Sequence, residues 1–337
     1  MTDARHDALG ERTSVAGLLR PARVARIPYL NSAPFYVSWS ELEPRSEGLW
    51  TSVDLPPRQL GQAAEAGEID AGLMALADLT RLEDQFEPIV VPAQPERETF
   101  GIANQDRVES VLLFVRAARV LESPSGTHSP SPRFAAGQDL SRAEAHRLDG
   151  ATIGVTGETS TSFRLLRLLL EVRYGVQPES YRRLPLALDD AITASGPDAL
   201  DAALVIGDLA LRWQHRPPAG FVQAIDLSAA WRDWKDLPFV FARWSVRREL
   251  PDEAKVWLGR FLGESLSRGL SRLPELTRDL PADLGDREHL TSYLRGFTYR
   301  LGAPEEEAAA EYQRLVRRHG LLTEPGPVTT PPRFTAP

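Results

Sequence analysis

The chain has 337 residues, 42% of them hydrophobic and 26% charged, and its formal net charge is −8 at pH 7. This acidic balance argues against a nucleic-acid-binding protein, whose binding face is basic. The chain contains no cysteine, which excludes disulfides, thiolate nucleophiles, iron–sulfur clusters and cysteine zinc sites. The length favours two domains, because a single core rarely grows beyond about 250–300 residues.

The two ends of the chain are expected to be flexible. Residues 1–20 mix acidic and basic side chains, without an apolar stretch long enough for a signal peptide, and residues 323–337 are rich in proline. No run in the sequence approaches the roughly 20 apolar residues of a membrane-spanning helix. The sequence therefore predicts a cytoplasmic protein with no membrane or nucleic-acid partner, and it leaves the oligomeric state open.

Apolar runs alternate with helical patterns from Val24 onward. Strands are expected over residues 23–27, 50–55, 69–74, 88–93, 99–103 and 108–115, and helices over residues 33–42, 57–67 and 75–85. This βαβ succession is typical of an α/β protein whose sheet is covered by helices.

A segment rich in Ser, Pro and Gly, residues 117–149, interrupts this succession, and we interpret it as a mobile surface insertion. Beyond it, strands are expected over residues 151–155, 199–207, 221–227 and 237–246. Helices are expected over residues 187–194, from Asp208, and after the loop that begins at residue 156. The pattern after Pro251 is helical as far as the tail.

Two of the expected strands could carry the chain between two lobes, namely residues 110–114 and 238–244. If both cross, the first lobe combines residues 21–115 with 239–322. The second lobe then holds residues 116–238, including the insertion at 117–149. Such a protein has a two-strand hinge and a central cleft. Small ligands bind α/β proteins between domains and at the carboxyl ends of strands, so the cleft is the expected site.

The stretch Arg26–Tyr36, RIPYLNSAPFY, ends the first strand in neutral polar side chains held between two prolines. Proline stops a strand and is well tolerated at the start of a helix. The two prolines are therefore expected to fix Asn31 and Ser32 at the mouth of the cleft. Tyr29 precedes this loop and could line the cleft.

A second polar stretch, Gly154–Ser162 (GVTGETSTS), follows a strand and opens a helix, as a phosphate-binding loop does. It lacks the GK[ST] ending of such a loop. Free N–H groups at a helix start, joined by neighbouring hydroxyls, could instead hold a carboxylate. The alternative is that one hydroxyl only caps the helix. Asp208 raises the same choice, because it directly follows a strand and is either a helix cap or a cleft residue.

The six histidines are far apart in the sequence and show no paired spacing, so no metal site is expected. Serine-hydrolase chemistry is also disfavoured, since the sequence has no GxSxG motif. Only two lysines, Lys235 and Lys255, could serve as a base or Schiff-base amine.

Several stretches occur in the order found in chorismate dehydratases, the first enzymes of the futalosine route to menaquinone. They are YLNSAP, GEIDAGL, SVLLF, TSTS, IGD and LPFVFARW, and together they extend over roughly Val24 to Gly320 without the insertion. The chain thus resembles this family. The resemblance implies a two-lobed fold like that of type II periplasmic binding proteins, which agrees with the βα succession. It also implies a hydro-lyase that converts chorismate to 3-[(1-carboxyvinyl)oxy]benzoate.

Under this resemblance, Asn31 and Ser32 are the expected catalytic residues. The expected substrate-binding residues are Tyr29, Ser110, Ser160, Thr161, Ser162 and Asp208. Neutral donors suit a substrate that brings two carboxylates, and neither a cofactor nor a metal is required. The base stays open between Asp208 and the substrate's own enolpyruvyl carboxylate.

Two other functions remain as alternatives. A related enzyme of the same route, 1,4-dihydroxy-6-naphthoate synthase, uses the same scaffold, but it typically carries an SPCPND-like segment where this chain has PYLNSAP. A cytoplasmic protein that binds small carboxylates without catalysis is the third possibility.

Overall fold

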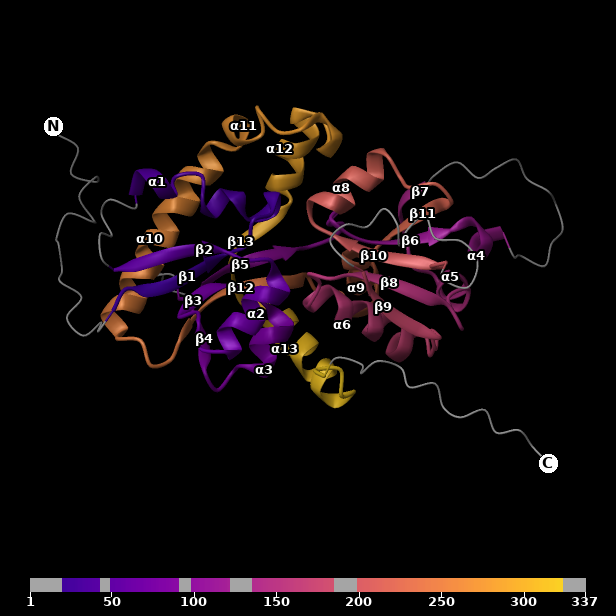
Figure 1. The fold of residues 1–337 in the computed structure, drawn as a ribbon, viewed down its shortest axis with the longest axis horizontal. Coiled ribbons are helices and arrows are strands. Elements are labelled where there is room, and N and C mark those ends of the chain that lie inside the picture. Colours follow the sequence, from indigo (N-terminus) through magenta and orange to yellow (C-terminus); the bar gives the residue numbers. More distant parts are fainter. Residues whose placement is uncertain (1–19, 43–48, 91–97, 122–134, 185–198, 324–337) are drawn as a thin grey trace.

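The computed structural model describes residues 20–42, 49–90, 98–121, 135–184 and 199–323. Two β-sheets, each with helices packed against it, lie side by side along the long axis of the molecule (Figure 1). We call the first sheet with its helices the first lobe and the second sheet with its helices the second lobe. The predicted α/β class and two-lobed architecture are confirmed.

The first lobe is built on a sheet with the strand order β13-β5-β12-β3-β1-β2, and β4 pairs with β12. Its strands are β1 (Ala22–Arg26), β2 (Trp50–Asp54), β3 (Ala71–Ala75), β4 (Phe86–Pro88), β5 (Thr99–Asn104), β12 (Phe239–Arg247) and β13 (Phe297–Leu301). Its helices are α1 (Trp39–Leu42), α2 (Pro57–Glu65), α3 (Leu76–Arg81), α10 (Asp252–Ser271), α11 (Leu273–Leu276), α12 (Arg287–Arg295) and α13 (Ala303–Arg318). Two short 3-10 helices, Leu30–Phe35 and Ala282–Leu284, complete the lobe.

The second lobe has a sheet with the strand order β7-β11-β6-β10-β8-β9. Its strands are β6 (Val111–Arg116), β7 (Ala135–Gln138), β8 (Thr152–Thr156), β9 (Ser180–Leu184), β10 (Ala202–Ile206) and β11 (Phe221–Asp226). Its helices are α4 (Ala117–Leu121), α5 (Arg142–His146), α6 (Thr161–Arg167) with a π-helical continuation Leu168–Arg173, α8 (Asp208–His215) and α9 (Leu227–Lys235).

The chain passes between the sheets twice, along residues 105–110 and residues 236–238. The strand expected over 110–114 forms β6 of the second sheet, and the strand expected over 238–244 forms β12 of the first. The crossing therefore comes just before each of these strands. Our sequence-based lobe limits differ from the sheets at β6, which they place in the first lobe.

The structure differs from the sequence-based assignment of elements in several places. No strand was expected where β9 pairs with β8, and the helix expected over residues 33–42 is a 3-10 helix, Leu30–Phe35, followed by the short α1. The segment after Pro251 is not entirely helical, since β13 pairs with β5 in antiparallel fashion. Within residues 117–149, the described flanks form α4, β7 and α5 instead of a structureless insertion. Ser141 and Glu144 form a capping box at the start of α5, which is a helix signal in the sequence. Residues 122–134, the expected helix at 187–194, the leader to residue 19 and the tail from residue 324 lie outside the described residues.

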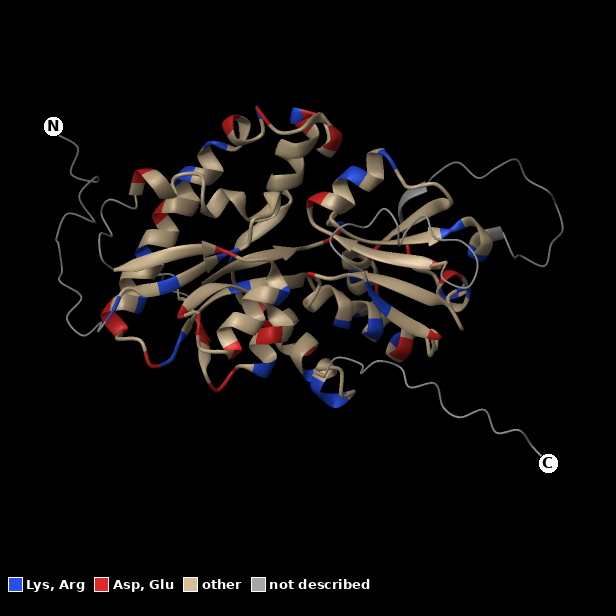
Figure 2. Cartoon of the chain, in the orientation of Figure 1, with Lys and Arg blue, Asp and Glu red and all other residues tan. Residues whose placement is uncertain are grey.

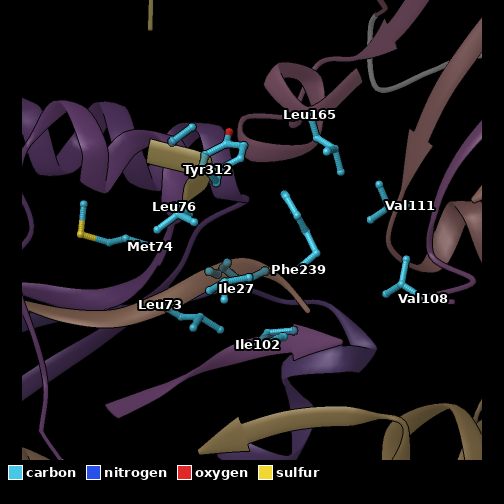
Figure 3. Packing of buried hydrophobic residues seen from close by; sticks show 14 of the residues in the cluster. Ile27, Leu73, Met74, Leu76, Ile102, Val108, Val111, Leu165, Phe239 and Tyr312 are labelled. Atoms are coloured by element: carbon cyan, nitrogen blue, oxygen red, sulfur yellow. The ribbon is translucent and has the colours of Figure 1, made fainter. Parts of the chain in front are cut away.

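The hydrophobic core is continuous between the lobes. One cluster of buried side chains includes Ile27 and Ile102 of the first lobe and Val111 and Leu165 of the second. Figure 3 shows Phe239 between these two groups. Apolar side chains of both lobes therefore make up much of the region where the lobes meet.

Charged residues of both signs are interspersed over both lobes (Figure 2). In the described part of the chain, no helix is both long enough and apolar enough to cross a membrane.

Candidate active site

A pocket lies between the lobes, where the carboxyl ends of β1 and β3 face those of β8 and β10. The space within it, which is open to solvent, is about 540 Å³. It is lined by Ile27, Tyr29, Asn31, Pro57, Ala75, Ile102, Val108, Ser110, Val111, Ser160, Thr161, Ser162, Ile206, Gly207, Phe241 and Ala242. None of these described lining residues carries a charge.

Asn31 is the polar group of this pocket that most clearly lacks a partner. It belongs to the 3-10 helix Leu30–Phe35, which contains Pro34 and follows β1. The Oδ1 atom of Asn31 is buried and accepts no hydrogen bond from the described residues. A buried polar atom without a partner is costly, and its presence in a native protein calls for a ligand or solvent partner. The position of Asn31 in the pocket is the one that the sequence predicted.

Ser32 does not line the pocket, although the sequence suggests it as a catalytic residue. Its side chain is fully buried. The hydroxyl oxygen lies 2.6 Å from the carbonyl oxygen of Ile27 and 2.7 Å from that of Tyr29. Since a hydroxyl has one proton, these carbonyls share it. Ser32 thereby closes the turn that presents Asn31, and its hydroxyl faces away from the pocket.

The start of α6 contributes three predicted residues to the pocket, but their hydroxyls differ in availability. Thr161 Oγ1 accepts a hydrogen bond from the Ala77 N–H at 3.2 Å and donates to the Phe241 carbonyl at 3.0 Å, so its proton is already used. Ser160 Oγ accepts a hydrogen bond from Arg164 at 3.3 Å. The Ser162 hydroxyl makes no hydrogen bond within the described part of the chain, which leaves it able to donate to a ligand.

Tyr29 and Ser110 also line the pocket, as predicted. The Tyr29 hydroxyl donates a hydrogen bond to Glu158 of the second lobe. Burial raises the pKa of Tyr29 above its ordinary value, and the bond to Glu158 raises it further, so the phenol stays protonated. Ser110 is buried in the segment that links β5 to β6, and its hydroxyl donates to the Val108 carbonyl over a long 3.3 Å.

Asp208 is not among the lining residues, in contrast to its predicted role in binding substrate. Its Oδ1 accepts a hydrogen bond from the Leu30 N–H at 3.0 Å, across the boundary between the lobes. Burial raises the pKa of Asp208, and the bond from Leu30 acts in the opposite direction. The residue begins α8, with Gly207 as the N-cap, so it is neither a plain cap nor a ligand-facing carboxylate.

Sequence reasoning did not single out Glu158 or Gly207. Glu158 lies inside the polar stretch Gly154–Ser162, for which the sequence analysis considered only the hydroxyl groups and the free N–H groups. Gly207 has a backbone φ of +64°, and a Cβ atom there would lie 3.2 Å from the Tyr29 ring. The signal that could have found Gly207 is the glycine between a strand and a helix in the IGD stretch.

Two histidines that are far apart in the sequence come together in the fold. The rings of His215 and His289 lie 5.6 Å apart, centroid to centroid, at the contact between α8 and α12. Within the ranges that the structure describes, no three residues of the types His, Cys, Asp and Glu are grouped so as to hold a metal ion.

A family model described as "Menaquinone biosynthesis" matches residues 131–318. The chain is 34% identical to a chorismate dehydratase of Thermus thermophilus over 287 residues, which cover 82% of this chain and 91% of that protein. The chain belongs to this menaquinone-biosynthesis family. A 1,4-dihydroxy-6-naphthoate synthase of the same organism is 24% identical over 188 residues, covering 54% of this chain and 65% of the synthase.

A solved structure from Candida albicans supports the fold assignment. It is described as having the generic periplasmic-binding-protein fold, and it superposes with a TM-score of 0.55 at 13% identity, over 91% of this chain and 92% of that one. The predicted periplasmic-binding-protein-like fold is confirmed.

Proposed function

We propose that the protein is a chorismate dehydratase, a hydro-lyase that converts chorismate to 3-[(1-carboxyvinyl)oxy]benzoate and water. The observation that carries this proposal is the 34% identity to a chorismate dehydratase along 91% of that protein. The pocket is consistent with it, because a buried, unpartnered amide oxygen of Asn31 stands in an uncharged lining of apolar and hydroxyl-bearing side chains.

The neutral lining suits a substrate with two carboxylates. Asn31 offers an amide donor and an acceptor, and the hydroxyl of Ser162 offers a further donor. Such donors can orient carboxylate and hydroxyl groups without a fixed counter-charge. Holding the substrate in a reactive conformation can lower a barrier by as much as about 7–11 kcal/mol in the best intramolecular cases. The residues of the pocket are thus suited to positioning more than to acid–base chemistry.

The elimination breaks the bond between a ring carbon and the hydroxyl group, and a proton leaves the neighbouring ring carbon. The electron pair of that C–H bond forms the new ring double bond, the ring becomes aromatic, and hydroxide and proton leave as water. We propose that the enolpyruvyl carboxylate of the substrate takes the proton and passes it to the departing hydroxyl group, which leaves as water. This is supported by Asp208, whose carboxylate is engaged with the Leu30 N–H and stands outside the lining.

Purified protein incubated with chorismate tests the function. We expect a new aromatic absorbance and a product lighter than chorismate by one water in mass spectrometry. The cyclic futalosine-derived substrate of the naphthoate synthase serves as the second arm on the same sample. Turnover of that substrate alone would replace the proposal with the synthase, and binding of chorismate without a product would replace it with a carboxylate-binding protein.

The base is tested separately with Asp208→Asn, which keeps the side-chain size. Substrate-assisted proton removal predicts that this variant retains measurable turnover. Complete loss of turnover with unchanged chorismate binding would assign the base to Asp208.

A further inference from the structure

The second lobe holds the first lobe at the two residues that immediately precede Asn31. The Tyr29 hydroxyl donates to a carboxylate oxygen of Glu158, and the Leu30 N–H donates to Asp208 Oδ1 at 3.0 Å. Tyr29 and Leu30 follow β1 of the first sheet, whereas both carboxylates come from the second sheet. Each contact therefore exists only while the lobes lie together.

The two carboxylates stand at the same edge of the second sheet. β8 and β10 are neighbouring parallel strands, Glu158 lies two residues beyond the end of β8, and Asp208 lies two residues beyond the end of β10. Gly207 adds a third contact between the lobes, because a Cβ atom built on it would lie only 3.2 Å from the Tyr29 ring. The second lobe thus contacts the short segment Tyr29–Leu30 at three places: the Tyr29 hydroxyl, the face of the Tyr29 ring and the Leu30 N–H.

Neither carboxylate lines the pocket. This matters because a carboxylate facing the ligand would repel a dianionic substrate. Glu158 and Asp208 direct their oxygens at donors of the first lobe instead. Any effect they have on the reaction must pass through Tyr29 and Leu30 to the next residue in the chain, Asn31.

We infer that Glu158 and Asp208 are positioning residues that couple closure of the lobes to the placement of Asn31. We call the contacts Tyr29–Glu158 and Leu30–Asp208 the latch. When the lobes separate, the latch breaks and the 3-10 helix that carries Asn31 loses its support from the second lobe, which allows release of the product. The inference rests on the proposed function only for the identity of the substrate.

The Tyr29–Glu158 contact is tested with Tyr29→Phe, Glu158→Ala and the double variant. A hydrogen bond to a charged group supports a loss of about tenfold or more in kcat/KM for chorismate on removal of either partner. The double variant should lose no more than the worse single variant, because both changes break one contact. Additive losses, or no loss in either single variant, would overturn the inference.

A matched control is present within the second lobe. The Tyr181 hydroxyl donates to Glu171 Oε1 at 2.9 Å, away from the pocket and without crossing between lobes. Tyr181→Phe removes the same kind of hydrogen bond, and Glu171→Ala removes it together with the ion pair between Glu171 and Arg167. They should leave kcat/KM within about twofold of the unmodified protein. An equal loss in both pairs would mean that the effect is one of general stability, which would overturn the positioning role.

A second readout does not need turnover. Because the sequence has no cysteine, the exposed residues Ala143 of α5 and Glu253 of α10 can be changed to cysteine and spin-labelled. The distance distribution between the labels should widen or lengthen in Glu158→Ala and stay unchanged in Glu171→Ala. An unchanged distribution in Glu158→Ala would overturn the latch. Absence of any turnover with chorismate would contradict the proposed function and leave this measurement intact.

Discussion

Gly269 of α10 lies so close to Pro34 that a Cβ atom on Gly269 would come within 1.9 Å of the Pro34 carbonyl oxygen. On the same helix, Ser265 Oγ donates a hydrogen bond to the Phe35 carbonyl at 2.6 Å. The 3-10 helix that presents Asn31 is therefore supported from behind by α10 and from the front by the latch. The close contact between the backbones of Gly269 and Pro34, more than any side chain, fixes the 3-10 helix against α10.

Gly269→Ala is expected to destabilise the protein and to displace Asn31. The added methyl group meets backbone atoms, which cannot rotate away, and overpacking of this kind costs about 1–3 kcal/mol or more. We expect a lower thermal midpoint together with a fall in kcat/KM. Gly263→Ala in the same helix is the control, because its Cβ would meet only side-chain atoms at ordinary contact distances, Phe100 Cζ at 3.5 Å and Arg300 Nη2 at 3.8 Å. That change should be neutral or stabilise the helix by up to about 1 kcal/mol. Equal effects of both changes would contradict the close-contact argument.

Asn31→Ala should separate activity from stability. Its Oδ1 has no partner in the described residues, so truncation removes no hydrogen bond and the free energy of unfolding should stay the same or rise. Turnover of chorismate should fall about tenfold or more, because the contact that we propose between Asn31 and the substrate is lost. Asn104→Ala is the matched control. The Asn104 side chain bonds the Gly296 carbonyl and the Asp106 N–H, so its loss should lower stability. Full activity in Asn31→Ala would disprove the site assignment.

Ser32→Ala is expected to act in the opposite way. Its hydroxyl donates within the turn Ile27–Tyr29, and loss of one buried hydrogen bond costs about 1 kcal/mol. Chemical denaturation should show this loss, while kcat should change less than in Asn31→Ala. Ser38→Ala is the control, since the Ser38 hydroxyl is buried without a partner among the described residues and its removal should cost little. A larger fall of kcat in Ser32→Ala than in Asn31→Ala would restore a catalytic role for Ser32.

Periodicity in the sequence predicts most of the strands that position the pocket. β3, for example, is buried at all five positions and reads as an apolar run before a helix. β13 was missed because its buried and half-buried residues alternate over only five positions, directly after the periodic pattern of α12. Such a short alternation between helices is hidden by the longer helical pattern.

The sequence predicts those pocket residues that belong to a recognisable local pattern. It misses those whose role depends on a contact between residues far apart in the chain. Asn31 and Ser162 lie in the pocket because their polar stretches follow strands. Ser32 has the same local signal as Asn31, but the 3-10 turn directs its hydroxyl to the backbone. Glu158 acts on Tyr29, which is 129 positions away along the chain, and no local pattern marks such a pairing.

We expect Asp226, which lies against the link between the lobes, to make the stability of the protein depend on pH. Its carboxylate accepts hydrogen bonds from the N–H groups of Val108 and Glu109 in the link and from those of Ser228 and Ala229 in α9. Burial raises the pKa of Asp226 to about 6, against an ordinary value of 3.8, although these four bonds favour the ionised form.

The sign follows from proton binding. Between about pH 4 and pH 6 the folded protein holds this proton more tightly than the unfolded chain does, so the contribution of Asp226 to the free energy of unfolding falls as the pH rises and levels off above pH 6. One pKa unit corresponds to about 1.4 kcal/mol, which sets the scale of the fall at about 3 kcal/mol. Asp226→Asn cannot titrate and should lack this component, so the stability difference between the unmodified protein and the variant should shrink from pH 4 to pH 6. Urea unfolding at pH steps measures it, and a difference that stays constant or grows with pH would contradict the raised pKa.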